Sequence, residues 1–286
     1  MMHVAEAGEA KGRVVLQLCS AAPSTVALEA AVWVARAFQS EIESLYVENQ
    51  QLLELAGHPF VREISLTGRN KRAVSLLEIE RHFRFASAEF QRRVEALASQ
   101  AEVRVRGRVI RDDPVSALAA ACAENGPWNL VALAEPFTSP NCPAISTLFD
   151  RIADTTGLLV VGPRALRAKG RIVLALERAE LLNAMLATAE RLSSVSESPV
   201  TVCLIAEGAE EMAELEAAAR LALSERRDVS IVTLDVSRGS PASTGEALRR
   251  LSPGLIMCQF GGVLLPREGD LKPLAEALEC PLLVVR

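Results

Sequence analysis

The chain repeats a set of strand-like segments, and this internal repeat constrains its fold more than any other feature. Arg13–Leu18 (RVVLQL) corresponds to Arg171–Leu176 (RIVLAL), which follows it by 158 positions. Leu158–Val161 (LLVV) recurs unchanged as Leu282–Val285, 124 positions later. Self-similarity at a set spacing indicates that one structural unit is built more than once. The sequence therefore predicts two similar units in tandem.

The spacing between corresponding segments changes once by a large step, and the step locates an insertion. The second strand, Ile42–Val47, lies 158 positions before its counterpart, Val200–Ile205. The third strand, Glu102–Ile110, lies 126 positions before Asp228–Val236. The first half thus carries about 32 extra residues between its second and third strands. We place this insertion at about residues 48–81.

Helical patterns separate the strand-like segments throughout both halves. The strands, such as Leu130–Ala134 and its counterpart Leu255–Gln259, are short and almost continuously apolar. Strands buried on both faces of a sheet have this composition. Amphipathic patterns such as Ser24–Phe38 and Pro114–Asn125 lie between them. The alternation predicts an α/β fold of two tandem, doubly wound, Rossmann-like domains, residues 1–165 and 166–286, each with a parallel sheet.

Composition and residue spacing exclude several functions. The net charge of -5 provides no basic field, so we expect no nucleic-acid partner. The apolar runs are strand-sized, well short of the roughly 20 residues that cross a bilayer, so we expect no membrane partner. The N-terminus lacks the apolar stretch of a secretory signal, which predicts a cytoplasmic protein. Scattered cysteines and three unrelated histidines predict no metal site.

No set of catalytic residues is visible in the sequence. There is no arrangement typical of a Ser-His-Asp triad, no Cys-His pair in a recognisable context, and no Walker-type phosphate loop. Three histidines leave few groups for general base catalysis. We therefore expect a protein that is not an enzyme, with weak ATPase activity as the remaining alternative.

Two segments resemble the universal stress protein family. Val109–Pro114, followed by a helix and by Asn129–Val131, is similar to the family's strand, Gly-Asp-Pro-like turn, helix and fourth strand. Cys280–Val285 (CPLLVV) is similar to its closing Cys-Pro-Val-Leu-Val-Val strand. The resemblance covers almost the whole chain outside the N-terminal tail and the insertion. It implies two five-stranded sheets in the order 3-2-1-4-5, joined near Pro163–Gly170 and packed as an intramolecular pseudo-dimer; whether the chain dimerises further stays open.

Many members of that family bind ATP with an Asp that ends the first strand and a Gly-x2-Gly-x9-Gly-Ser/Thr loop that follows the fourth. Glycines let the backbone approach phosphates closely. In the first half, Ala134 and Phe137 stand at the two leading glycine positions, and in the second half only Gly261 is kept, after Cys258. The Asp positions hold Cys19 and Glu177. The resemblance therefore implies a degenerate motif. The candidate ligand-binding residues are Cys19, Ser146, Thr147, Glu177 and Gly261.

Each of these candidates also has an ordinary structural interpretation. Glu177 either accepts a hydrogen bond from a ligand, as the family's Asp does, or is a solvated residue at a strand end. Gly261 and Gly262 form either a remnant of an anion-binding nest or a tight turn. Cys19 is either a redox-sensitive thiol or a buried structural one.

The insertion is the most distinctive part of the sequence. One interpretation is a docking surface or a lid, with Phe60 as an apolar anchor and Arg62 and Arg69 as polar contacts. The other is a cap that packs on its own domain, with Phe60 buried. The candidate interaction residues are Pro59, Phe60, Arg62, Glu63 and Arg69.

An apolar stripe at helical spacing follows the insertion. Leu76, Ile79, Phe83 and later residues recur every three or four positions. An unbroken helix over Arg72–Ser99 would be about 42 Å long at roughly 1.5 Å per residue, longer than a domain of this size. We expect this helix either to break or to project toward the other half.

These observations lead to two functional hypotheses. The first is a non-enzymatic cytoplasmic protein of stress response or regulation that binds another protein, whose identity the sequence does not give, and needs no cofactor. The alternative is a stress sensor that binds ATP, AMP or another small ligand at the degenerate motif.

Overall fold

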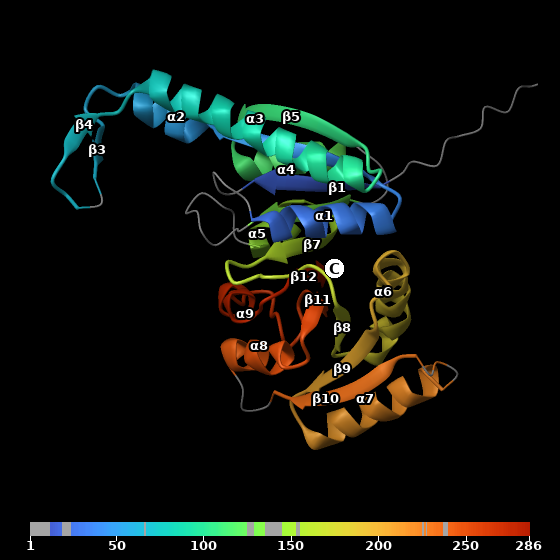
Figure 1. Ribbon diagram of the computed structural model, residues 1–286. Helices are drawn as coiled ribbons and strands as arrows, with labels where there is room; N and C mark the ends of the chain where they lie inside the picture. Colours follow the sequence, from blue (N-terminus) through green and yellow to red (C-terminus); the bar gives the residue numbers. More distant parts are fainter. Residues whose placement is uncertain are drawn as a thin grey trace, which may run out of the picture.

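The computed structural model describes residues 12–18, 24–65, 67–124, 129–134, 145–152, 155–224, 226, 228–236 and 240–286. Ten strands form one sheet, with helices on both of its faces (Figure 1). The strands are β1 (Arg13–Leu18), β2 (Glu41–Asn49), β5 (Val105–Asp112), β6 (Asn129–Ala134), β7 (Thr155–Val161), β8 (Arg171–Leu176), β9 (Val200–Ala206), β10 (Ser230–Asp235), β11 (Pro253–Gln259) and β12 (Leu282–Val285). The helices outside the insertion are α1 (Thr25–Ala37), α4 (Pro114–Ala123), α5 (Ile145–Arg151), α6 (Leu182–Ser196), α7 (Ala209–Ala222), α8 (Pro241–Arg249) and α9 (Lys272–Ala277).

The strand order repeats within the sheet. It runs β10-β9-β8-β11-β12-β7-β6-β1-β2-β5, so each half has the order 3-2-1-4-5, and strands within a half are parallel. The predicted α/β class, with two five-stranded parallel arrays, is therefore confirmed. The third strands begin later than predicted, at Val105 and Ser230; in the first half, a turn at Glu102 with φ 57° precedes the strand.

The two arrays join edge to edge, which the sequence did not predict. Strand β12 pairs antiparallel with β7, and Leu283 lies opposite Leu159. These two leucines are counterparts in the internal repeat, so the pairing relates the halves by a local two-fold axis that passes between them. Because the junction makes one continuous sheet, the division into domains 1–165 and 166–286 stays a prediction.

The core forms two layers, one on each face of the sheet. Along β1, Val14 and Leu16 belong to the core layer that includes buried residues of α1, α3, α6 and α7, whereas Val15 belongs to the layer that includes those of α4, α5, α8 and α9. This division follows from the two-residue period of a strand, whose side chains point alternately to opposite faces. Burial of each such aliphatic side chain stabilises the fold by about 1.5–3 kcal/mol.

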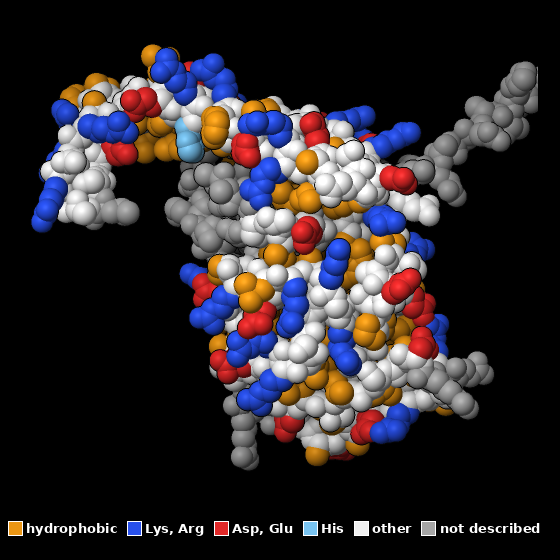
Figure 2. Space-filling model, viewed as in Figure 1, with side chains coloured by type: hydrophobic (Ala, Val, Ile, Leu, Met, Phe, Trp, Pro, Cys, Tyr) orange, Lys and Arg blue, Asp and Glu red, His pale blue; other side chains and the backbone are white. Residues whose placement is uncertain are grey.

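The insertion forms a helix and a hairpin. It contains α2 (Gln50–Gly57), β3 (Arg62–Ile64) and β4 (Lys71–Ala73), and it leads into α3 (Leu76–Gln100). The hairpin extends from the ends of α2 and α3 and lies clear of the ten-stranded sheet (Figures 1 and 2). We call Pro59–Ala73 the projecting hairpin.

Helix α3 begins later than the sequence predicted, and it does not break. Lys71–Ala73 pair with β3 instead of joining the helix, and the Ser75 side chain caps the helix by accepting the N–H of Glu78. Its main contacts are with α1, α2, β2 and β5 of the first half, and α1 in turn packs on α6 of the second. The expectation that the long helix would reach toward the other half is therefore wrong.

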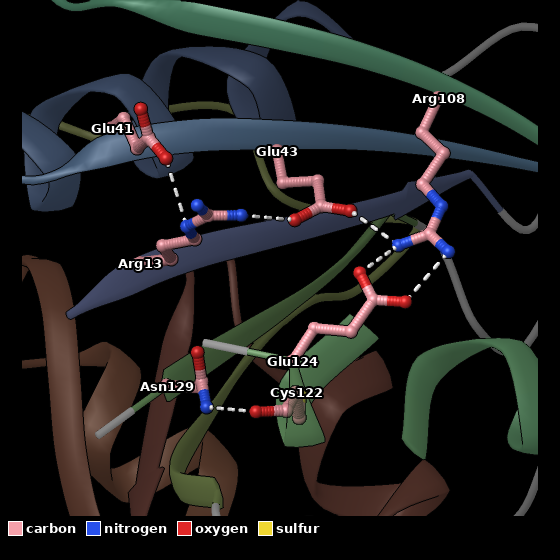
Figure 3. A network of polar contacts seen from close by, with 7 residues as sticks. All are labelled: Arg13, Glu41, Glu43, Arg108, Cys122, Glu124 and Asn129. Carbon is pink, nitrogen blue, oxygen red and sulfur yellow. Dashed lines mark hydrogen bonds and ion pairs between the residues drawn. The ribbon is translucent and has the colours of Figure 1, made fainter. Parts of the chain in front are cut away.

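A buried ion-pair network ties the first half together at the amino ends of its strands (Figure 3). Glu43 on β2 is only 1% exposed and accepts hydrogen bonds from Arg13 at 2.8 Å and Arg108 at 3.4 Å. Arg13 also pairs with Glu41, and Arg108 binds both carboxylate oxygens of Glu124 after α4. The network thereby links β1, β2, β5 and α4.

In the second half, hydroxyl groups take the place of the acidic partners. Arg171, the counterpart of Arg13, donates a 2.9 Å hydrogen bond to the Thr201 hydroxyl, which contacts the Ser230 hydroxyl at 2.7 Å. Both arrangements lie at the amino ends of the strands. Ligands of doubly wound sheets bind at the opposite, carboxyl ends, so these arrangements stabilise the fold rather than form a site.

Candidate functional site

A cavity of about 380 Å³ lies at the carboxyl ends of the strands of the second half. Glu177 directly follows β8, Glu207 follows β9, and Gly261 lies just beyond β11. In doubly wound sheets this edge is where ligands bind. We call this space the Glu177 cavity; it is lined by Glu177, Arg178, Glu207, Glu211, Gly261, Gly262, Val263 and Pro266.

Glu177 is held by its own chain. Its side chain is largely buried, with 9% of the residue exposed, and its carboxylate accepts hydrogen bonds from the backbone N–H groups of Val263 and, at 2.9 Å, Leu264. Burial raises the pKa of the Glu177 carboxyl, while the two hydrogen bonds and the charge of Arg178 oppose that rise. The interpretation of Glu177 as a solvated residue at a strand end is therefore wrong, because the loop after β11 folds over it.

The two glycines after β11 make this arrangement possible. Gly261 has φ 82°, in the left-handed region, and its N–H closes a turn onto the carbonyl of Leu265 at 2.8 Å. A Cβ atom at Gly262 would overlap the carboxylate of Glu177. The tight-turn interpretation is confirmed for Gly261. The next amides do bind an anion, but that anion is Glu177.

Charges around the cavity disfavour a second anion. Glu207 and Glu211 line it together with Glu177, against the single guanidinium of Arg178. Arg178 is already engaged, since its Nε donates to the Gln259 side chain at 3.1 Å and its Nη1 lies 3.8 Å from Glu180. A nucleotide phosphate entering here would meet mostly negative charge.

The described ligand-binding candidates of the first half do not line this cavity. Ser146 and Thr147 are half-buried in the first turn of α5 and are not among the residues that line it. Cys19 and Phe137 lie outside the described residues. Among the predicted ligand-binding residues that the structure describes, only Glu177 and Gly261 line one cavity.

The predicted interaction residues lie together and are exposed. Phe60 is 91% exposed, so the interpretation in which it is buried under a cap is wrong. Among the described residues, strand β3 pairs only with β4, and every residue of both strands is exposed. The other predicted interaction residues, Pro59, Arg62, Glu63 and Arg69, are also exposed.

Three features of this surface were not predicted. Ile64 on β3 and Leu77 at the start of α3 are 57% and 64% exposed, so this part of the molecule carries exposed apolar side chains besides Phe60. Leu77 falls outside the periodic apolar stripe of the helix, and this position could have predicted its exposure. Arg72 pairs with Glu63 at 2.6 Å across the hairpin and with Glu78 at 3.2 Å, which fastens the hairpin to α3.

The projecting hairpin carries unpaired positive charge. Arg62, Arg69 and Lys71 are exposed, and none of them forms an ion pair with any carboxylate in the described part of the chain. Figure 2 shows Lys and Arg side chains over this segment beside hydrophobic ones. The surface therefore combines apolar and cationic groups.

Two kinds of feature are absent from the described ranges. None of the helices found there has the length and apolar character needed to cross a membrane. The same residues contain no group of three or more His, Cys, Asp or Glu side chains arranged to hold a metal ion.

No protein-family model and no curated protein matches the sequence. Solved structures do match the fold. A universal stress protein from Archaeoglobus fulgidus DSM 4304 is 14% identical, with 97% of each chain covered and a TM-score of 0.62. The cytoplasmic domain of a prokaryotic cation chloride cotransporter is 12% identical, with 96% of this chain and 95% of that chain covered and a TM-score of 0.53. The protein thus has a doubly wound α/β fold, and more specifically the fold of universal stress proteins.

Proposed function

We propose that the protein is a non-enzymatic regulatory protein of the stress-response type, and that it acts by binding another protein through the projecting hairpin. The observation that carries this proposal is the 91% exposure of Phe60 on a hairpin that lies clear of the sheet. Burial of a Phe side chain stabilises a complex by about 1.5–3 kcal/mol, so an exposed Phe is a strong potential anchor.

The chemistry of the hairpin defines the partner surface it fits. The side chains of Phe60, Ile64 and Leu77 fit an apolar pocket on the partner. The side chains of Arg62 and Arg69 can pair with carboxylates on the rim of that pocket. Aromatic and Arg side chains dominate the binding energy of protein interfaces, with polar contacts at the edge. The partner is therefore a protein with an apolar groove bordered by acidic residues.

The Glu177 cavity supports a role without nucleotide. A phosphate needs free backbone N–H groups, and those of Val263 and Leu264 are engaged by Glu177. ATP or AMP would have to displace a carboxylate from its own hydrogen bonds. This favours the protein-binding role over the alternative of an ATP or AMP sensor. It also supports the proposal that the nucleotide motif is degenerate and that the protein works without catalysis and without a cofactor.

The proposal extends to the setting of the protein. We take the chain to be a tandem of two universal stress protein-like domains that form an intramolecular pseudo-dimer in the cytoplasm, without nucleic-acid partners. The antiparallel pairing of β7 with β12 supports the pseudo-dimer, since it places repeat-related strands side by side.

Site-specific photocrosslinking in the source cells tests the binding role. A photoreactive amino acid replaces Phe60, and in a matched control it replaces Leu221 on α7, which is also apolar and 78% exposed. We expect one discrete adduct from position 60 only, and we expect Arg62→Glu to remove it. Equal adducts from both positions, or none from position 60, would contradict the proposal. Nucleotide turnover that Glu177→Ala abolishes would contradict the non-enzymatic part.

A further inference from the structure

A second cavity, of about 420 Å³, lies where the two halves of the sheet meet. Leu130, Gly157 and Leu283, from β6, β7 and β12, line it together with Leu181 and Met185, at and in the start of α6. It shares no residue with the Glu177 cavity. Its volume is typical of sites for small molecules.

The local two-fold axis relates Arg191, which lines this cavity, to a buried residue of the first half. Trp33 on α1 and Arg191 on α6 are counterparts, separated by the same 158 positions that relate β1 to β8. Trp33 is buried, and its indole N–H donates to the carbonyl of Leu192 at 3.2 Å. Arg191 is exposed and lines the cavity. A guanidinium thus lies on this side of the axis at the position that a buried indole occupies on the other side.

Arg191 has no acidic partner in the part of the chain that the structure describes. Its guanidinium lies 5.7 Å from the centre of the Phe38 ring, which also lines the cavity. The other charged side chain in the lining is that of Arg286, whose guanidinium donates to the carbonyls of Phe149 at 3.1 Å and Ile152 at 3.5 Å. The guanidinium of Arg191 thus borders a mostly apolar space that no Asp or Glu side chain lines.

We propose that this cavity binds a small amphipathic carboxylate of the medium-chain fatty-acid class. The alkyl chain lies against Leu130, Leu283 and Met185, where its burial is favourable. The carboxylate lies at Arg191, where it forms a charge-assisted ion pair that a neutral head group cannot form. The proposal does not depend on the projecting hairpin.

Calorimetry with hexanoate, octanoate and decanoate tests this site in the full chain. We expect affinity to rise about fourfold per added methylene until the cavity is full. Arg191→Gln weakens decanoate binding about tenfold or more and leaves decanol binding unchanged, because only the carboxylate pairs with the guanidinium. Arg220→Gln on α7, which removes an exposed guanidinium paired with Glu216, leaves both unchanged.

Two variants that fill the cavity complete the test. Met185→Trp blocks it from the buried wall, and Ala184→Leu blocks it from the exposed rim, so the second remains informative if the first does not fold. Each folded variant loses decanoate binding, whereas Phe60→Ser retains it. The proposal is overturned if decanoate does not bind at millimolar concentration, or if Arg191→Gln and Ala184→Leu bind it as tightly as the wild type.

Discussion

The carboxylate of Glu177 accepts the backbone N–H of Leu264 at 2.9 Å, although 87 positions separate the two residues in the chain. Together with the N–H of Val263, this contact holds the loop after β11 against the end of β8. An intramolecular carboxylate thus lies where the resemblance to nucleotide-binding proteins places a ligand.

Loss of this contact should destabilise the fold. Glu177→Gln leaves one oxygen to accept two N–H groups and turns an amide donor toward the other, so we expect a loss of about 1–3 kcal/mol in the free energy of unfolding. Urea denaturation measures the change. Glu207→Gln, at an exposed position beside the same cavity, is the matched control and should be nearly neutral.

The same carboxyl should make stability depend on pH. Burial raises the folded-state pKa of Glu177 above its ordinary value of about 4.5, so the folded protein holds this proton more tightly than the unfolded chain. The stabilisation is complete below that value and is lost as the pH rises through the folded pKa. The stability of the wild type relative to Glu177→Gln should therefore fall as pH rises above about 4.5. A difference that is constant from pH 4 to 8 would contradict this.

Gly262 and Glu177 should behave as a coupled pair. A Cβ atom at position 262 would overlap the carboxylate of Glu177 and displace it. Gly262→Ala should therefore destabilise the wild type by about 1–3 kcal/mol, because Glu177 loses its hydrogen bonds to Val263 and Leu264. In the Glu177→Ala background the clash is gone, and the same substitution should cost much less. A double-mutant cycle measures this coupling. Gly57→Ala, where a Cβ contacts nothing within 4 Å, controls for the glycine change itself.

The buried network of the first half should be sensitive to loss of its central acid. Glu43→Gln replaces the buried carboxylate that Arg13 and Arg108 share with a neutral amide, while Glu41 and Glu124 still pair with the two guanidiniums, so we expect a loss of about 1–3 kcal/mol. Chemical denaturation checks this value. Glu89→Gln removes the partner of an exposed ion pair on α3 and should have a far smaller effect.

Three buried cysteines of the second half should react only when the protein unfolds. Burial raises the pKa of the Cys203 and Cys280 thiols to about 12, and it raises the pKa of Cys258 further. Thiolates are the reactive form. Iodoacetamide followed by mass spectrometry should therefore label these three residues in urea but not in native buffer. Rapid labelling of Cys258 in the native protein would contradict the burial described for β11.

The sequence predicted the strands because these depend on local patterns, and the resemblance to universal stress proteins implied their order. Buried parallel strands are short apolar runs, and the repeat of Arg13–Leu18 as Arg171–Leu176 marked equivalent strands in the two halves. The insertion was placed by the same offsets. The division of 71–76 between β4 and α3 was missed, since three residues of an exposed hairpin carry no periodic signal.

The candidate site was predicted only in part, because its geometry depends on contacts between distant segments. Glu177 and Gly261 were singled out, but nothing near either residue indicates that Glu177 accepts the amides of a loop about 86 positions away. The exposure of Phe60 likewise depends on where other segments of the chain lie, which the residues around Phe60 do not indicate. The cavity beside Arg191 follows from comparison with Trp33 only once the local two-fold axis is known.

The pairing of Leu159 with Leu283 at the centre of the sheet has a consequence for stoichiometry. A dimer of two identical chains comes apart on dilution and must present every surface twice, whereas repeat-related strands within one chain stay together at any protein concentration. The two halves also have separate stretches of sequence, so a substitution in one half leaves the other half unchanged. Among the described residues, the projecting hairpin belongs to the first half alone, and the position of Arg191 holds Trp33 in the other half, so the binding that we propose involves one partner and one ligand per chain.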